Sequence, residues 1–420
     1  MNNEYEAVIV GAGLSGLVAA LELEKSNLSY AIFEEDANVG GRVQTDNYNG
    51  FLLDRGFQIF LEAYPEARKF LDYGSLNLKP FYSGARVRKN GQFYDLLDPL
   101  KNPKTTLNTL QSPIGKISDK LNIAKLKLDY GNKDVNEFYD YKNISTYDAL
   151  LKLGFSQGFL DDFLSPLFRG IFLEKELATD FSFFEFVFTM LANGDNVVPE
   201  LGMGQIPIQL KKKINCQNIF FQHKVLEIKE NSIIVDEIGE IKAQSVILAT
   251  NEIQALKLLK SMKLAIKFNA QTCLYFALNV QPFHEPILVL NANKDELINN
   301  LTIMSNVSSS YAPPGKHLLS VCLVGNPDLD DDILIDRVSK ELGQWYPNLA
   351  QDFEFLKLYR INYALPCIND NNKTDPELLG FKNVFLAGDY LENGSINGAM
   401  KSGRKAASKA INYLNSLKKQ

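Results

Sequence analysis

A glycine-rich turn near the N-terminus restricts the fold of this chain more than any other segment. Residues 5–10 are an apolar run that predicts a strand, the turn is Gly11-Ala12-Gly13-Leu14-Ser15-Gly16, and helical apolar spacing follows. Gly11 permits a tight turn, Gly13 permits close approach of a pyrophosphate, and Gly16 permits close packing of helix on strand. The N–H groups and dipole of the helix N-terminus favour an anion beside Leu14 and Ser15. The segment therefore predicts a dinucleotide-binding unit.

An acidic residue at the end of the second predicted strand, residues 30–33, agrees with this interpretation. Glu34 lies at the spacing expected for a carboxylate that binds the ribose hydroxyls of an adenosine, and Glu35 follows it. A negative charge here repels a 2′-phosphate and so disfavours NADP. Because strand, turn, helix and acid agree, a plain glycine-rich turn before a buried helix is the weaker explanation.

Two more segments bring glycine and charge together downstream. Gly40-Gly41-Arg42 brings backbone close to a cofactor, and Arg42 has the fork geometry that binds a phosphate through two bonds. A two-glycine turn with a surface arginine is the alternative. Residues 53–58 follow, in which Gly56 and Phe57 are expected where the chain passes a flavin ring.

A third glycine-containing segment lies near the C-terminus. Gly388-Asp389 follows a short strand, residues 384–386, and precedes a glycine-punctuated helix expected from about residue 395. Asp389 can accept hydrogen bonds from ribitol hydroxyls. The helix N-terminus, at Ile396, would face the flavin pyrimidine, where a reduced flavin carries negative charge. By itself this segment would favour the simpler explanation, a glycine-rich helix packed on a sheet.

Together these segments resemble the FAD-dependent amine oxidase superfamily, which includes phytoene-desaturase-like and protoporphyrinogen-oxidase-like enzymes. The resemblance covers residues 8–58 and 383–407, with a weaker match at residues 199–207. It implies one bound FAD and a contact between the backbone of Val225 and the adenine. The cysteines form no Cys-x-x-Cys pair and none lies in the last strand or helix, so we expect non-covalent FAD and buried free thiols in a reducing compartment.

The order of predicted elements indicates an α/β fold. We expect a discontinuous FAD-binding Rossmann-like domain and a substrate domain with a second, mixed or mostly antiparallel sheet. The FAD-binding domain is predicted to comprise residues 1–85, 197–262 and 372–420. The substrate domain is predicted to comprise residues 86–196 and 263–371, including a helical insert at about residues 100–195.

Composition excludes several other classes of protein. The net charge of −6 argues against a nucleic-acid partner, which requires a basic face. Three scattered histidines offer no metal-ligand set, so no metal is expected. No apolar run has the length of a membrane span. We therefore expect a cytoplasmic enzyme with a small apolar substrate. Peripheral membrane contact is compatible with the sequence, and the oligomeric state is left open.

Two departures from the resemblance bear on the substrate. Amine oxidases of the superfamily typically carry an aromatic residue just before the last helix, where it forms half of a cage for the amine, but residues 394–398 contain none. They also often use a lysine near flavin N5, but residues 271–276 contain none. Both departures argue against amine oxidation. Residues 155–188 contain ten phenylalanines, which either line an apolar tunnel or fill a helical core. We name no catalytic residue, and the candidates from motif-rich segments are Arg55, Gln58, Arg169 and Tyr390.

The prediction is therefore an FAD-dependent oxidoreductase that transfers a hydride from an apolar substrate to flavin N5. The substrate class expected is isoprenoid, carotenoid or porphyrinogen-like. The alternatives on the same scaffold are an amine or amino-acid oxidase, a non-redox flavin-dependent isomerase, and a binding module without catalysis.

Overall fold

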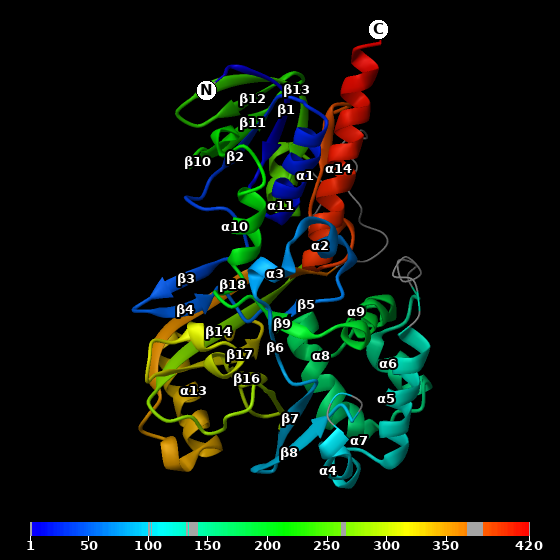
Figure 1. The fold of residues 1–420 in the computed structure, drawn as a ribbon, viewed down its shortest axis with the longest axis vertical. Helices are drawn as coiled ribbons and strands as arrows, with labels where there is room; N and C mark the ends of the chain where they lie inside the picture. Colours follow the sequence, from blue (N-terminus) through cyan, green and yellow to red (C-terminus); the bar gives the residue numbers. More distant parts are fainter. Residues whose placement is uncertain are drawn as a thin grey trace.

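The computed structural model describes residues 2–99, 101, 103–131, 133, 142–261, 266–367 and 381–419. Two large sheets and a group of helices make up most of the molecule (Figure 1). The sheet that contains the N-terminal strand lies at one end, together with the long C-terminal helix. The second sheet and the helices α4–α9 lie side by side at the other end.

The first sheet has the strand order β10-β2-β1-β13-β12-β11, with β19 paired to β13. Strands β1, β2, β10, β13 and β19 run parallel, and β11 and β12 add an antiparallel hairpin. The strands are β1 (Glu4–Val10), β2 (Tyr30–Glu34), β10 (Ile219–Phe221), β11 (Val225–Ile228), β12 (Ser232–Val235), β13 (Gly239–Leu248) and β19 (Val384–Leu386).

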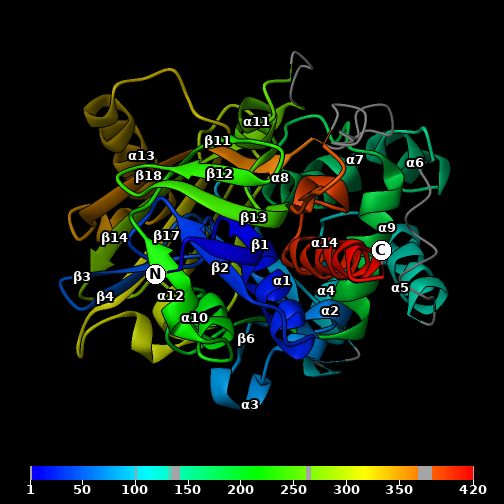
Figure 2. The same cartoon turned by 90° about the horizontal axis from the view of Figure 1, so that it is seen from above.

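Alternate residues of β1 point to opposite faces of this sheet, as strand geometry requires. Ala7 and Ile9 pack with the helices α1 (Leu14–Lys25) and α14 (Ile396–Leu417). Val8 and Val10 pack on the other face with the β11–β12 hairpin and α11 (Glu252–Leu258). Figure 2 shows α1 and α14 on one side of the sheet and α11 on the other. Because both faces are covered, β1 is apolar throughout its core length.

The strand β13 is longer than its apolar run. Continuous apolar residues begin at Val246, but β13 begins at Gly239. Its first residues, Gly239 to Lys242, pair antiparallel with β12, and its later residues pair parallel with β1. The exposed and polar first half has no continuous apolar run, so periodicity alone does not mark it as part of a buried strand.

The second sheet has the order β18-β14-β17-β16-β15-β7-β8. All neighbours are antiparallel except β15 and β7, so the predicted mostly antiparallel sheet is confirmed. The strands are β7 (Gly84–Lys89), β8 (Gln92–Leu97), β14 (Phe268–Leu278), β15 (Leu288–Asn291), β16 (Asn300–Ile303), β17 (His317–Val324) and β18 (Glu354–Pro366), and α13 (Asp331–Trp345) packs on them.

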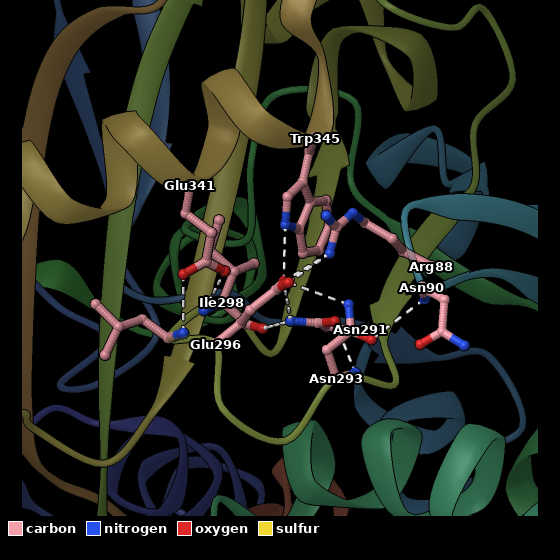
Figure 3. A network of polar contacts seen from close by, with 9 residues as sticks. Arg88, Asn90, Asn291, Asn293, Glu296, Ile298, Glu341 and Trp345 are labelled. Atoms are coloured by element: carbon pink, nitrogen blue, oxygen red, sulfur yellow. Dashed lines mark hydrogen bonds and ion pairs between the residues drawn. The ribbon is translucent and has the colours of Figure 1, made fainter.

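A polar network ties α13 to the loop between β15 and β16 (Figure 3). The carboxylate of Glu296 accepts hydrogen bonds from Arg88 at 2.7 and 2.8 Å, from Asn291 at 2.9 Å and from the Trp345 indole at 3.0 Å. The Arg88 guanidinium also lies over the Trp345 ring, 4.7 Å from its centroid. Glu341 accepts the backbone N–H groups of the next two loop residues, at 2.9 and 3.0 Å.

The helical insert lies beside this sheet, as Figure 1 shows. Its helices are α4 (Thr106–Gln111), α5 (Ile117–Tyr130), α6 (Thr146–Lys152), α7 (Gln157–Phe159), α8 (Ser165–Phe172) and α9 (Phe181–Asn193). A single π-helical turn, Leu160–Leu164, joins α7 to α8. Across the described ranges, none of the helices combines the length and apolarity that a bilayer crossing demands.

Short elements connect these parts. They are β3 (Thr45–Tyr48) with β4 (Phe51–Asp54), β5 (Phe60–Leu61) and β6 (Lys79–Pro80) on either side of β9 (Asn196–Val198), and the helices α2 (Pro65–Phe70), α3 (Tyr73–Leu76), α10 (Gln205–Lys211) and α12 (Met304–Val307).

We propose the two-domain division given above. Its 85/86 boundary lies inside β7, and its boundaries at 262/263 and 371/372 lie outside the described residues.

Candidate functional site

A single cavity of about 1350 Å³ runs from the first sheet into the helical insert. The sheet end is bounded by the turns that follow parallel strands β1, β2, β13 and β19. This is the edge where ligands bind in open parallel sheets, because the carboxyl ends of the strands meet there. The cavity is therefore the candidate functional site.

The first glycine turn forms one wall of this cavity. Gly11 has φ of 102°, which L side chains rarely adopt, and a Cβ at Gly16 would lie 2.0 Å from the Gly11 carbonyl oxygen. The helix α1 begins at Leu14, with Gly13 as its N-cap. Gly13, Leu14 and Ser15 line the cavity, and a Cβ at Gly13 would meet open space. The first turn of α1 is thus accessible to an anion.

Glu34 ends β2 and faces the same cavity from a buried position. One carboxylate oxygen accepts the Ala12 N–H at 2.6 Å and the other accepts the Asp36 N–H at 2.9 Å. Burial raises the pKa of Glu34, although these two hydrogen bonds favour the ionised form. Each oxygen keeps a further lone pair for a hydroxyl donor. Glu35 also lines the cavity and pairs with Lys224 at 2.5 Å.

Arg42 has a protein partner. Its guanidinium donates to Asp389 at 2.5 Å and to the Ala364 carbonyl at 3.0 Å. The predicted second and third segments therefore meet, although 347 residues separate them in the chain. Gly41, Arg42, Gly388 and Asp389 all line the cavity. An ion pair to Asp389 leaves fewer guanidinium donors for a phosphate than the sequence alone suggested.

The C-terminal helix meets the first helix at the cavity. The side chain of Ser395 caps α14 by accepting the Gly398 N–H at 2.9 Å, and Ile396 lines the cavity. A Cβ at Gly403 would lie 2.1 Å from the Ser15 carbonyl oxygen, so a larger residue would separate α14 from α1. The N-termini of both helices therefore border one cavity.

The remaining predicted residues fall into two groups. Phe57 and Val225 line the cavity, whereas Gly16 and Gly56 do not. A Cβ at Gly56 would lie 2.6 Å from the Ile361 side chain, so this glycine permits close packing of the loop on β18. Among the catalytic candidates, Arg55 and Gln58 line the cavity.

Arg169 and Tyr390 lie outside the residues that line the cavity. The Arg169 guanidinium donates to the Lys175 carbonyl, and the Tyr390 side chain is buried. Their position in motif-rich segments did not predict where their side chains lie. The expectation of four buried thiols was also wrong, because Cys216 is exposed and Cys367 is only partly buried.

Sequence reasoning missed several cavity residues. His223 lies beside Glu34, and its buried Nδ1 has no hydrogen-bond partner in the part of the chain that the structure describes. Gln58, which the sequence did name as a candidate, donates to the Arg42 carbonyl at 2.9 Å, and its buried Oε1 is likewise unpartnered among the described residues. Thr250 and Asn251 follow β13 at the ligand-binding edge, and that position after a buried strand was the available signal.

The far part of the cavity separates the ten phenylalanines into two sets. Five line the cavity: Phe159, Phe163, Phe168, Phe183 and Phe188. The other five are buried in the core: Phe155, Phe172, Phe181, Phe184 and Phe186. Phe159 and Phe168 belong to both descriptions, because they line the cavity and are also only 1% exposed in the core. Tunnel and core, the two explanations offered by the sequence, are therefore both represented in the set.

Aromatic residues also reach the cavity from the second sheet. Tyr359 and Tyr363 on β18 line it, as does Gln271 on β14. The hydroxyl of Tyr359 donates to Asp46 at 2.7 Å, and burial together with this bond raises the pKa of Tyr359. The helical part of the cavity contains one carboxylate among the described residues, Asp98, which pairs with Lys127.

The family model of the flavin-containing amine oxidoreductases matches residues 14–411. The chain belongs to this family. The predicted superfamily, α/β fold class, oxidoreductase activity and flavin cofactor are therefore confirmed at the level of the family.

Relatives of the chain include porphyrinogen oxidases. Coproporphyrinogen III oxidase of Bacillus subtilis (strain 168) is 22% identical over 98% of this chain and 99% of its own length. Protoporphyrinogen oxidase 2 of Arabidopsis thaliana is 42% identical, but only over 64 residues, 15% of this chain and 13% of that protein. The crystal structure of an oxidoreductase from Methanosarcina mazei has a TM-score of 0.74 and 18% identity, covering 96% of this chain and 99% of that one.

Proposed function

We propose that the chain binds one FAD without a covalent bond and oxidises an apolar substrate at carbon. The observation that carries this proposal is the continuity of the cavity, which joins the glycine segments of the first sheet to the five phenylalanines of the insert. A bound flavin supplies a hydride acceptor at N5. The protein supplies orientation, exclusion of water and fixed charges around it.

The residues at the sheet end fit FAD. Glu34 would bind the adenosine ribose, and the adjacent His223, whose Nδ1 is unpartnered among the described residues, and the backbone of Val225 would contact the adenine half. The open backbone at Gly13 and the first turn of α1 suit a pyrophosphate. Asp389 and the N-terminus of α14 would serve the ribitol and pyrimidine ends, where Gln58 also has an unpartnered oxygen.

The positions of the cysteines support non-covalent binding. No cysteine belongs to the described residues that line the cavity. We therefore expect denaturation to release intact FAD from the yellow protein. Acid precipitation followed by chromatography of the supernatant measures this release. Flavin that stays with the precipitated polypeptide would contradict the non-covalent proposal, and FMN in the supernatant would contradict FAD.

The lining of the insert favours an apolar substrate over a cationic amine. Burying apolar surface contributes about 25 cal/mol per Å². A cationic amine needs a charged partner in such surroundings, and Asp98 already pairs with Lys127. The relative that matches over the whole length is named a coproporphyrinogen III oxidase, which is not an amine oxidase.

Anaerobic flavin bleaching separates the candidate substrates. We expect reduction by one class among porphyrinogens, carotenoids and other isoprenoids, and no rapid reduction by polyamines, aromatic monoamines or amino acids. One observation favours amine oxidation: Tyr359 and Tyr363 line the cavity, and the faces of aromatic rings attract cations such as a protonated amine. Rapid bleaching by an amine would replace the apolar-substrate proposal with that second candidate.

A further inference from the structure

The helix α5 presents an apolar stripe to solvent. At about 100° per residue, Ile117, Leu121, Ala124 and Leu128 lie within roughly 60° of one another around the helix axis. All four are exposed, with Ile117 at 64% and Leu128 at 74% of full exposure. The opposite face is buried and packs into the insert through Leu126 and Tyr130. The helix therefore has a core face and a second apolar face that nothing in the described chain covers.

The neighbouring helix α4 extends this apolar surface. Leu107 and Leu110, three residues apart on α4, are exposed at 63% and 42%. The Lys120 ammonium donates to the carbonyls of Leu110 and Ser112 at 3.0 and 2.8 Å, which holds the end of α4 beside α5. Together the exposed Leu107, Leu110, Ile117, Leu121, Ala124 and Leu128 form what we call the α4–α5 face.

Positive charge borders the α4–α5 face. By the same helical geometry, Lys116, Lys120 and Lys127 lie on one side of the stripe and Lys125 on the other. Residues 101–130 contain six lysines, two aspartates and no glutamate, in a chain whose net charge is −6. Asp119 points inward and accepts hydrogen bonds from Ser156. Lys120 and Lys127 already bind protein groups, the carbonyls of Leu110 and Ser112 and the carboxylate of Asp98, whereas Lys116 and Lys125 are exposed. Exposed lysines beside an apolar surface extend their ammonium groups away from it toward anionic groups.

The α4–α5 face borders the open end of the cavity. Four residues of the face also line the cavity: Leu110, Leu121, Ala124 and Leu128. The bordering Lys120 and Lys127 line the cavity too. A molecule that covers the face would therefore lie at the entrance of the Phe-lined part of the cavity. In Figure 1, α4 and α5 lie at the end of the molecule remote from the first sheet.

We propose that the α4–α5 face docks on an anionic lipid bilayer, with the apolar stripe in the headgroup region and the exposed Lys116 and Lys125 against lipid phosphates. An exposed apolar helix face flanked by lysines is the arrangement that lies in the plane of a membrane interface. The flanking charge favours this occupant over a second copy of the chain, whose matching lysines would repel. Docking would let an apolar substrate pass from the bilayer into the cavity, a consequence that rests on the proposed function.

Vesicle flotation tests the docking. The flavin-loaded protein is expected to float with phosphatidylcholine vesicles that contain phosphatidylglycerol, and to float only weakly with vesicles of phosphatidylcholine alone. It should dissociate from the anionic vesicles as salt is added, because the Debye length falls to about 3 Å at 1 M. The double variants L107S/I117S and K116E/K125E should each lower the partition coefficient at least about tenfold. Leu107 and Ile117 do not line the cavity, so their loss leaves the cavity intact.

Matched controls are available on the first sheet and α14. L226S removes a leucine of 51% exposure, and K409E reverses an exposed charge on α14; neither should change vesicle binding. Flavin content and melting temperature show that each variant folds. Absence of flotation by the wild type, or equal loss in the controls, would overturn the docking. A dimer that the L107S/I117S variant converts to a monomer, without vesicle binding, would assign the face to self-association. Failed flotation with retained FAD would leave the proposed function unaffected.

Discussion

At the scale of single residues, Glu34 joins local structure to the proposed ligand. Its carboxylate accepts two backbone N–H groups and so holds the first glycine turn against the end of β2. The same oxygens face the cavity. The side chain therefore has a structural role that is present without ligand, and a proposed ribose contact that exists only with the adenosine half of FAD.

Glu34→Ala is expected to weaken FAD binding about tenfold to a hundredfold, because one charge-assisted hydrogen bond contributes about 1.5–3 kcal/mol. Titration of the apoprotein, followed by flavin fluorescence, measures the change. FMN lacks the adenosine half, so its affinity should change much less in the same variant. Equal weakening of FAD and FMN would show that Glu34 acts by shaping the turn and not by contacting the ribose.

Asp54 is a buried acid whose titration should affect stability. Its carboxylate accepts Thr45 Oγ1 at 2.5 Å, the Tyr311 hydroxyl at 2.8 Å and the Met203 N–H at 2.9 Å. Burial raises the pKa of Asp54 to about 6 from 3.8, and these hydrogen bonds lower it only in part. The folded state therefore binds the proton more tightly than the unfolded state. The contribution of Asp54 to the unfolding free energy falls as pH rises from about 4 to about 6.

Asp54→Asn should remove this pH dependence and stabilise the protein above pH 6, by an amount on the order of 3 kcal/mol or less. The amide can accept from Thr45 and Met203 through its oxygen, and can donate to the Tyr311 hydroxyl through its nitrogen. Urea unfolding of both proteins at pH 4.5 to 7.5 gives the comparison. A variant that is less stable than the wild type at the upper end of this range would show that Asp54 is stabilising as a carboxylate.

At the scale of elements, the network around Glu296 holds the β15–β16 loop on α13. Arg88 is buried and Glu296 is partly exposed, so loss of the carboxylate leaves a buried guanidinium without its anion. Glu296→Ala is expected to lower the unfolding free energy by about 2–4 kcal/mol. Lys340→Ala on the same α13 removes an exposed pair with Asp336 and should cost less than about 0.5 kcal/mol. Similar losses in both variants, by urea unfolding, would contradict this account.

At the scale of the whole molecule, the cavity assigns different roles to adjacent residues of α9. Phe183 lines the cavity and Phe184 is fully buried in the core. Phe184→Ala should lower the unfolding free energy by about 3–5 kcal/mol because it leaves a void. Phe183→Ala should cost less stability and should alter the KM of an apolar substrate. Calorimetry and steady-state kinetics of the two variants measure this difference, and equal destabilisation would assign both residues to the core.

The sequence by itself determined the elements whose causes are local. The strand β1, the positive φ of Gly11, the start of α1 and the cap of α14 each follow from residues within one turn of the element. The order of predicted elements likewise indicated a second, mostly antiparallel sheet, because the pattern of a half-buried element repeats along its own length. These elements were sufficient to predict the α/β fold class and the family.

Only the tertiary structure decided which side chains share a space. The ion pair between Arg42 and Asp389 joins segments 347 residues apart, so its existence depends on how β19 returns to the first sheet. Phe183 and Phe184 are the same residue type in the same helix, and the packing of α9 against its neighbours alone separates them. Propensity and periodicity act over a few residues, whereas a cavity is the volume left after distant elements have packed. The lining of that volume is therefore a property of the folded molecule.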